Sequence, residues 1–144
     1  MFSKIVVALT ELPESQRALR TAIDLAASFN ASLVTASLLG DLPAYAALAT
    51  IVDPTGPVTM QEQRREAQEE LHALAAGAAL DKHLRASHAI IEGSEVSSVL
   101  HFLKDQNADL LVIGLHQHDF LISRLWSSVY DLAQEASCSV LGVH

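Results

Sequence analysis

The fold is decided by residues 108–128, ADLLVIGLHQHDFLISRLWSS. This stretch begins with an uninterrupted apolar run, Leu110–Ile113, and Gly114 follows directly. Such a run is typical of a central strand that is buried on both faces of a parallel sheet. A glycine at the carboxyl end of the strand allows a sharp turn or the close approach of a ligand. Because ligands of open α/β sheets bind at the carboxyl ends of strands, this turn is the first candidate site.

Outward from this strand, apolar strands alternate with amphipathic helices along the whole chain. Strands are expected at 4–9, 32–39, 85–92, 110–113 and 139–143, with helices between them near 13–29, 59–79, 95–106 and 123–136. Residues 41–57 hold three of the four prolines and an apolar patch at 44–52, and we expect a long loop there. The strict alternation predicts a doubly wound parallel sheet with right-handed crossovers and helices on both faces.

The helix expected at 59–79 is strongly charged. Its few apolar side chains are therefore expected to mark the inner face, which packs on the sheet. The spacing of three and four residues places on that face Met60, Ala67, Leu71, Leu74 and Ala78.

Composition narrows the class of protein. A chain of 144 residues, half of them hydrophobic, predicts one folded domain over 1–144 rather than a disordered chain. The net charge of −8 argues against nucleic acid and anionic membrane surfaces as partners. No apolar run approaches the ~20 residues of a membrane helix, and no secretion signal is recognisable, so we expect a cytoplasmic protein. The single cysteine, Cys138, lies in an apolar pattern and is expected to be a small core residue.

Three segments together resemble the universal stress protein (UspA-like) family over essentially the whole chain. They are KIVVAL followed by SQRALRTAIDLAASFNASL, then IIEGSEVSSVLHFLKDQNADLLVIG, and finally SSVYDLAQEASCSVLGVH. The resemblance implies an open five-stranded parallel sheet of order 3-2-1-4-5. It also implies a homodimer, as in many members, and a nucleotide site of the kind that a subset of members uses for ATP.

The ATP-binding members carry Gly-x-x-Gly-x9-Gly-Ser/Thr after the fourth strand and an Asp after the first. Here Gly114 matches the first glycine and Ser128 the hydroxyl residue, but Gln117 and Ser127 replace the other glycines and Thr10 replaces the Asp. A side chain in the left-handed conformation costs about 1–2 kcal/mol and fills the space of a phosphate. We therefore expect no tight ATP binding and no resident cofactor.

The histidines of this turn allow a second interpretation. His116 and His118 precede Asp119, and imidazole with carboxylate suits a transition metal. No further ligand is marked by spacing, so solvated histidines are the simpler interpretation and no metal is expected. A protonated His116 would instead contact a phosphate. The candidate nucleotide or anion turn therefore comprises Thr10, Gly114, His116, Gln117, Ser127 and Ser128.

These observations favour a dimeric binding or regulatory module with an unidentified protein partner, not an enzyme. One alternative is a protein that binds ATP or AMP through a modified phosphate loop. A lower alternative is a weak hydrolase or metal-dependent enzyme, although no Gly-x-Ser-x-Gly elbow is present. The last strand would lie at a sheet edge, so Val140, Leu141 and Val143 are the expected dimer interface.

Overall fold

The computed structural model describes residues 1–40, 55–93, 96–115 and 129–144. Expectations for the apolar loop at 44–52 and for the turn at 116–128 lie outside the described residues. In chain order the elements are β1 (Lys4–Ala8), α1 (Pro13–Phe29), β2 (Ser32–Leu39), α3 (Gly56–Leu80), β3 (Ala86–Glu92), α4 (Val96–Asp105), β4 (Leu110–Gly114), α5 (Val129–Glu135) and β5 (Ser139–Val143).

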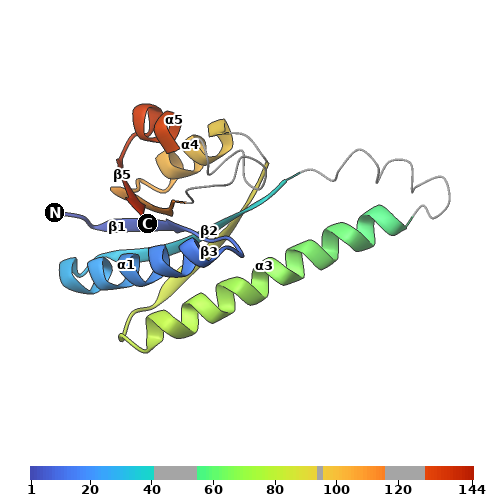
Figure 1. Ribbon diagram of the computed structural model, residues 1–144, viewed down its shortest axis with the longest axis horizontal. Helices are drawn as coiled ribbons and strands as arrows, with labels where there is room; N and C mark the ends of the chain where they lie inside the picture. Colours follow the sequence, from blue (N-terminus) through green and yellow to red (C-terminus); the bar gives the residue numbers. More distant parts are fainter. Residues whose placement is uncertain (41–54, 94–95, 116–128) are drawn as a thin grey trace.

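The five strands form one parallel sheet of order β3-β2-β1-β4-β5, which confirms the expected fold (Figure 1). In the central strand β1, Val6 is in register with Val34 of β2 on one side and with Leu111 of β4 on the other. The chain therefore changes direction across the sheet at β1. The carboxyl ends of β1 and β4 lie at the topological switch point, where open α/β sheets place their ligands.

Two apolar layers enclose the sheet, with α1 and α3 on one face and α4 and α5 on the other (Figure 1). Successive side chains of a strand point to opposite faces. In β1, Ile5 and Val7 accordingly pack with α1 and α3, and Val6 and Ala8 pack with α4 and α5. Burial on both faces explains why the central strands are uninterrupted apolar runs.

The ends of α1 follow from particular residues. Pro13 occupies the first turn, where a missing backbone N–H is no loss, and Glu14 places a negative charge at the positive end of the helix. The helix ends at Asn30, which has left-handed dihedral angles (φ 52°, ψ 43°) and donates its N–H to backbone oxygens of the last turn.

The long helix α3 corrects the sequence analysis in two respects. It begins at Gly56 rather than at Thr59, because the proline that was assigned to the loop fits the first turn of a helix. Its inner face is also only partly the expected one, since Leu71 and Ala78 pack against the apolar layer but two other expected residues do not. Ala67 is exposed and Leu74 is 75% exposed, whereas His72 and Ala75 are buried.

Gly114 has a packing role that the sequence did not reveal. A Cβ atom built at this position would lie 2.6 Å from both the carbonyl carbon and the carbonyl oxygen of Glu14. The first turn of α1 therefore packs directly on the end of β4, with no room for a side chain between the two backbones. Gly77 in α3 is the opposite case, because a Cβ atom there would meet no atom within 4 Å.

This difference predicts opposite effects of two identical substitutions. Gly114→Ala should destabilise the protein by about 1–3 kcal/mol, since the backbones of α1 and β4 must separate. Gly77→Ala, in an open helical position, should stabilise it by about 0.5–1 kcal/mol. Urea denaturation of both variants and the wild type measures the free energies of unfolding. A Gly114→Ala variant as stable as the wild type would contradict the close approach of the two elements.

Candidate functional site

The candidate site lies at the carboxyl ends of β1 and β4. Of the residues that the sequence analysis assigned to it, Thr10 and Gly114 are described, and both lie against the first turn of α1. His116, Gln117, Ser127 and Ser128, together with the weaker metal candidate His118, lie outside the described residues. The described geometry therefore concerns the β1 half of the site and the end of β4.

The turn after β1 is closed by two hydroxyl groups. The N–H of Thr10 donates to Ser15 Oγ (2.9 Å), and Thr10 Oγ1 accepts from the N–H of Leu12 (3.2 Å). Ser15 is 2% exposed and donates to the backbone oxygen of Ala8 (3.5 Å). Ser and Thr hydroxyls commonly satisfy the backbone of a turn in this way. As a consequence, the backbone N–H groups of Thr10 and Leu12 are already bonded within the turn.

On the other side of the site, the pairing of β4 with β5 continues beyond Gly114. The N–H of Leu115 donates to the backbone oxygen of Val143 (2.7 Å). A Cβ atom at Gly142 would lie 2.7 Å from Leu115 Cδ1, so the leucine side chain covers this glycine. Leu115 is thus held against the edge strand at the point where the chain leaves the sheet.

Glu14 and Arg17 bring opposite charges to the part of α1 that packs on the end of β4. Glu14 is 8% exposed, and its backbone lies directly beside Gly114. Arg17 Nη2 lies 3.9 Å from the carboxylate of Glu14, and Arg17 Nε donates to the backbone oxygen of His144 (2.8 Å). Both charges are therefore engaged with other groups of the protein.

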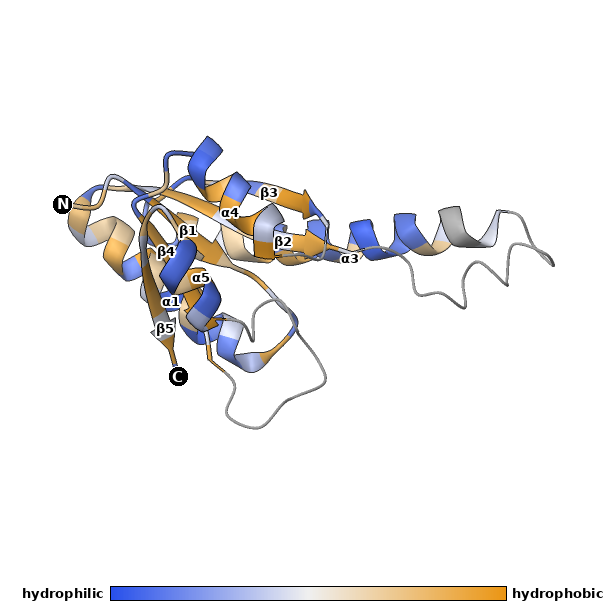
Figure 2. Ribbon diagram, turned by 90° about the horizontal axis from the view of Figure 1, so that it is seen from above, coloured by the Kyte–Doolittle hydropathy of each residue, from blue (hydrophilic) through white to orange (hydrophobic). Residues whose placement is uncertain are grey.

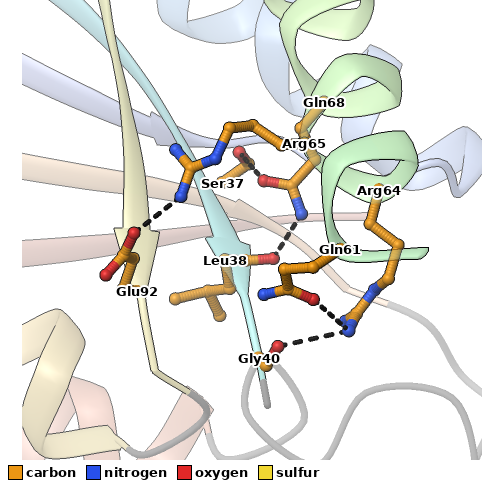
Figure 3. A network of polar contacts seen from close by, with 8 residues as sticks. All are labelled: Ser37, Leu38, Gly40, Gln61, Arg64, Arg65, Gln68 and Glu92. Carbon is orange, nitrogen blue, oxygen red and sulfur yellow. Dashed lines mark hydrogen bonds and ion pairs between the residues drawn. The ribbon is translucent and has the colours of Figure 1, made fainter. Parts of the chain in front are cut away.

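A second polar region, which the sequence analysis missed, joins α3 to the carboxyl ends of β2 and β3 (Figure 3). Arginine and glutamine side chains of α3 reach across to backbone oxygens and a carboxylate of the two strands. The contacts are Arg64 Nη1 to Gly40 O (3.2 Å), Arg65 Nη2 to Glu92 Oε1 (2.6 Å) and Gln68 Nε2 to Leu38 O (2.6 Å). These hydrogen bonds hold the middle of α3 against the ends of β2 and β3.

The origin of this region lies in β2, where Thr35 and Ser37 occupy alternate positions of an otherwise apolar strand. Both are buried on the face that α3 covers, and buried hydroxyls need hydrogen-bond partners. Gln68 and His72, one helical turn apart, supply those partners. The pair of hydroxyls at alternate positions is the sequence signal that would have identified the true inner face of α3.

Other groups that carry chemistry are few in the described ranges. Among these residues there is no cluster of three or more side chains that could hold a metal ion. Cys138 packs against the apolar layer of α4 and α5, and burial raises the pKa of its thiol, which disfavours the reactive thiolate. None of the helices in the part of the chain that is described has the length and apolar character of a membrane-spanning segment.

The comparisons with known proteins agree with this architecture. A protein described as a member of the universal stress protein family from Burkholderia pseudomallei is similar, with 24% identity and a TM-score of 0.74, over 98% of this chain and 95% of that chain. UspA from Lactobacillus plantarum shares 16% identity with a TM-score of 0.79, over 99% and 98% of the two chains. A universal stress protein solved in complex with cAMP shares 22% identity with a TM-score of 0.65, over 99% and 97%.

No curated protein matches the chain. At these identities the solved structures establish the fold alone. The model of the universal stress protein family, however, matches residues 1–144, which is the whole sequence. The five-stranded parallel sheet of order β3-β2-β1-β4-β5 is consistent with that match. The chain belongs to the universal stress protein family.

Proposed function

We propose that this chain is a cytoplasmic, dimeric binding or regulatory module that is not an enzyme and does not bind ATP tightly. The closed turn after β1 carries the proposal. Thr10 stands where ATP-binding members have Asp, and its N–H and its hydroxyl are both bonded within the turn.

A second candidate function is the binding of a nucleotide that carries less charge. It is favoured by the similarity to a universal stress protein solved in complex with cAMP. A nucleoside monophosphate, such as AMP or cAMP, carries less negative charge than ATP and needs fewer compensating cations at the turn. This candidate uses the same turn, so titration with both classes of nucleotide separates the two functions.

The first functional prediction concerns affinity for ATP. Mg-ATP should bind with a dissociation constant no lower than about 0.1 mM, or roughly −5.5 kcal/mol, in titration calorimetry. The triple variant Thr10→Asp, Gln117→Gly and Ser127→Gly should bind more tightly. An Asp at position 10 accepts from the N–H of Leu12 as Thr10 does, and its second oxygen remains available for a sugar hydroxyl.

Two partial variants make this test specific. Thr10→Asp alone restores only the acceptor for the sugar, and Gln117→Gly with Ser127→Gly restores only the phosphate loop. Each should recover part of the gain if both positions contribute. A micromolar constant for the wild type, or ATP that stays bound through purification, would overturn the proposal. Titration with AMP and cAMP under the same conditions tests the second candidate function.

The proposed homodimer rests on the contrast between the two edges of the sheet. At the β5 edge Leu141 is 37% exposed, while Val140 and Val143 pack against the two apolar layers. The opposite edge strand, β3, exposes polar side chains such as Ser87 and His88. An apolar edge invites strand pairing or must be covered, whereas a polar edge does neither. A two-fold contact through β5 would bury Leu141 against its own copy.

Sedimentation velocity tests this assembly. The wild type should sediment as a dimer at tens of micromolar, and Leu141→Glu as a monomer, because two carboxylates would be buried beside each other at the dyad. Leu74→Glu is the matched control, since Leu74 is also an exposed leucine but lies on α3. A monomeric wild type would contradict the dimer, and a folded Leu141→Glu variant that remains dimeric would place the interface elsewhere.

A further inference from the structure

The long helix α3 is attached to the sheet less firmly than the other helix on the same face. Figures 1 and 2 both show its first turns projecting beyond the ends of the strands. The described side chains of α3 that are fully buried are His72, Ala75 and Ala79. In α1, by contrast, Leu19 and Ile23 are buried together with several alanines. Leu71 and Ala78 add only partly buried apolar contacts. Since the free energy of burial scales with apolar area, we expect α3 to open from the domain more easily than α1.

His72 lies at the centre of the contact between α3 and β2. It is 2% exposed, and each ring nitrogen has one hydroxyl partner: Nδ1 lies 2.7 Å from Thr35 Oγ1, and Nε2 lies 2.8 Å from Ser37 Oγ. Ser37 Oγ donates to Gln68 Oε1 (2.7 Å), so it must accept from His72 Nε2–H. Thr35 then donates to Nδ1. This arrangement is complete for the neutral imidazole with its proton on Nε2.

A second proton on His72 has no favourable place in this arrangement. It would bind to Nδ1 and face the hydroxyl hydrogen of Thr35. Thr35 would have to turn its hydroxyl towards the backbone oxygen of Ser87, which lies at the longer distance of 3.4 Å. The positive charge would also be buried beneath α3, and a buried charge is unfavourable unless it is paired.

The charged groups around His72 do not supply that pairing. β2 has no ionisable side chain. β3 contributes His88, whose ring centroid lies 5.4 Å from that of His72, and Glu92, which is bonded to Arg65 of α3 at 2.6 Å. Arg64 adds a further positive charge on α3. Burial, and to a smaller extent the charge of His88, lower the pKa of His72 from 6.5 to about 4.

We infer that His72 is an acid-sensitive latch, and that its protonation releases α3 from β2 and β3 while β1, β4 and α1 remain folded. Release exposes the ring to water, where it binds a proton normally. The latch therefore stabilises the docked helix fully above the ordinary pKa of histidine and loses this effect as the pH falls towards 4. The inference requires neither a nucleotide nor a dimer, so it is independent of the proposed function.

Hydrogen exchange with peptide resolution tests the latch in the intact protein. With a pKa of 6.5 in the open state and about 4 in the docked state, the opening equilibrium of α3 should rise roughly 20-fold between pH 7 and pH 5. After correction for intrinsic exchange, peptides from residues 61–80 should lose protection by this factor. Peptides from β1 and β4 should change far less. Equal loss in α3 and the central strands would overturn the inference, as would unchanged protection of α3.

Two variants assign the effect to His72. His72→Gln keeps a neutral acceptor for Thr35 and a neutral donor for Ser37 but cannot titrate, so protection of α3 should no longer depend on pH. His101→Gln removes an exposed histidine of α4 that is paired with Asp105, and the wild-type dependence should persist. Retained pH dependence in His72→Gln would overturn the inference.

If His72→Gln does not fold, the ring protons of the wild type decide the question by NMR. The ring of His72 should remain neutral in the docked protein at pH 5, where an exposed histidine is largely protonated. A His72 ring that is largely protonated at pH 5, without any change in α3, would contradict the latch.

Discussion

The structure depends on a direct contact between two backbones, those of α1 at Glu14 and β4 at Gly114. A glycine is required there because a Cβ atom would lie within 2.6 Å of the helix backbone. This contact brings the first turn of α1 to the switch point of the sheet, where a ligand would otherwise have the most room. The hydroxyl of Ser15 then closes the turn after β1 from the same helical turn. The helix that builds the candidate site thus also fills part of it.

The two edges of the sheet illustrate how a parallel domain manages unpaired strands. β3 lies beneath α3 and shows polar side chains to solvent, which makes lateral pairing unfavourable. β5 exposes Leu141 instead, and its outer side has no comparable charge within Ser139–Val143. The two edges differ in the chemistry of their side chains and not in their strand pairing, because β3 and β5 each pair with a single neighbour in the described sheet. This contrast between opposite edges supports the proposal that two copies associate through β5.

The polar contact between α3 and β2 explains why this helix faces the sheet with polar as well as apolar side chains. Hydroxyls of β2 are buried by α3, and each must be satisfied, so the facing positions of the helix are taken by Gln68 and His72. A fully satisfied polar layer specifies one rotation of a helix more sharply than apolar packing does, but it contributes less to stability. Figure 2 shows the consequence, since the first half of α3 is largely hydrophilic where it leaves the sheet.

Structural features that depend on residues close together in the sequence could be predicted. Features that depend on residues far apart in the sequence could not. The runs at β1 and β4 predicted buried central strands correctly, because burial on both faces leaves a continuous apolar pattern in the sequence itself. The order of the strands came from the family resemblance and was confirmed. The candidate site stays a prediction, and the structure describes only the part of it at the ends of β1 and β4. Its closure by Ser15 and Glu14 could not be foreseen, because neither residue carries a ligand signature.

The rotation of α3 is the clearest case of information that the linear pattern lacks. Apolar spacing favoured Leu74 as an inner residue, yet Leu74 is 75% exposed and His72 is buried. The partners that reverse this preference are Thr35 and Ser37. They lie in β2, which ends at Leu39, whereas α3 begins only at Gly56. A helical pattern in the sequence ranks each residue by its own hydropathy. Burial in the folded protein also depends on which hydrogen bonds the opposing surface can form. That surface exists only once β2 and α3 have met in the folded domain.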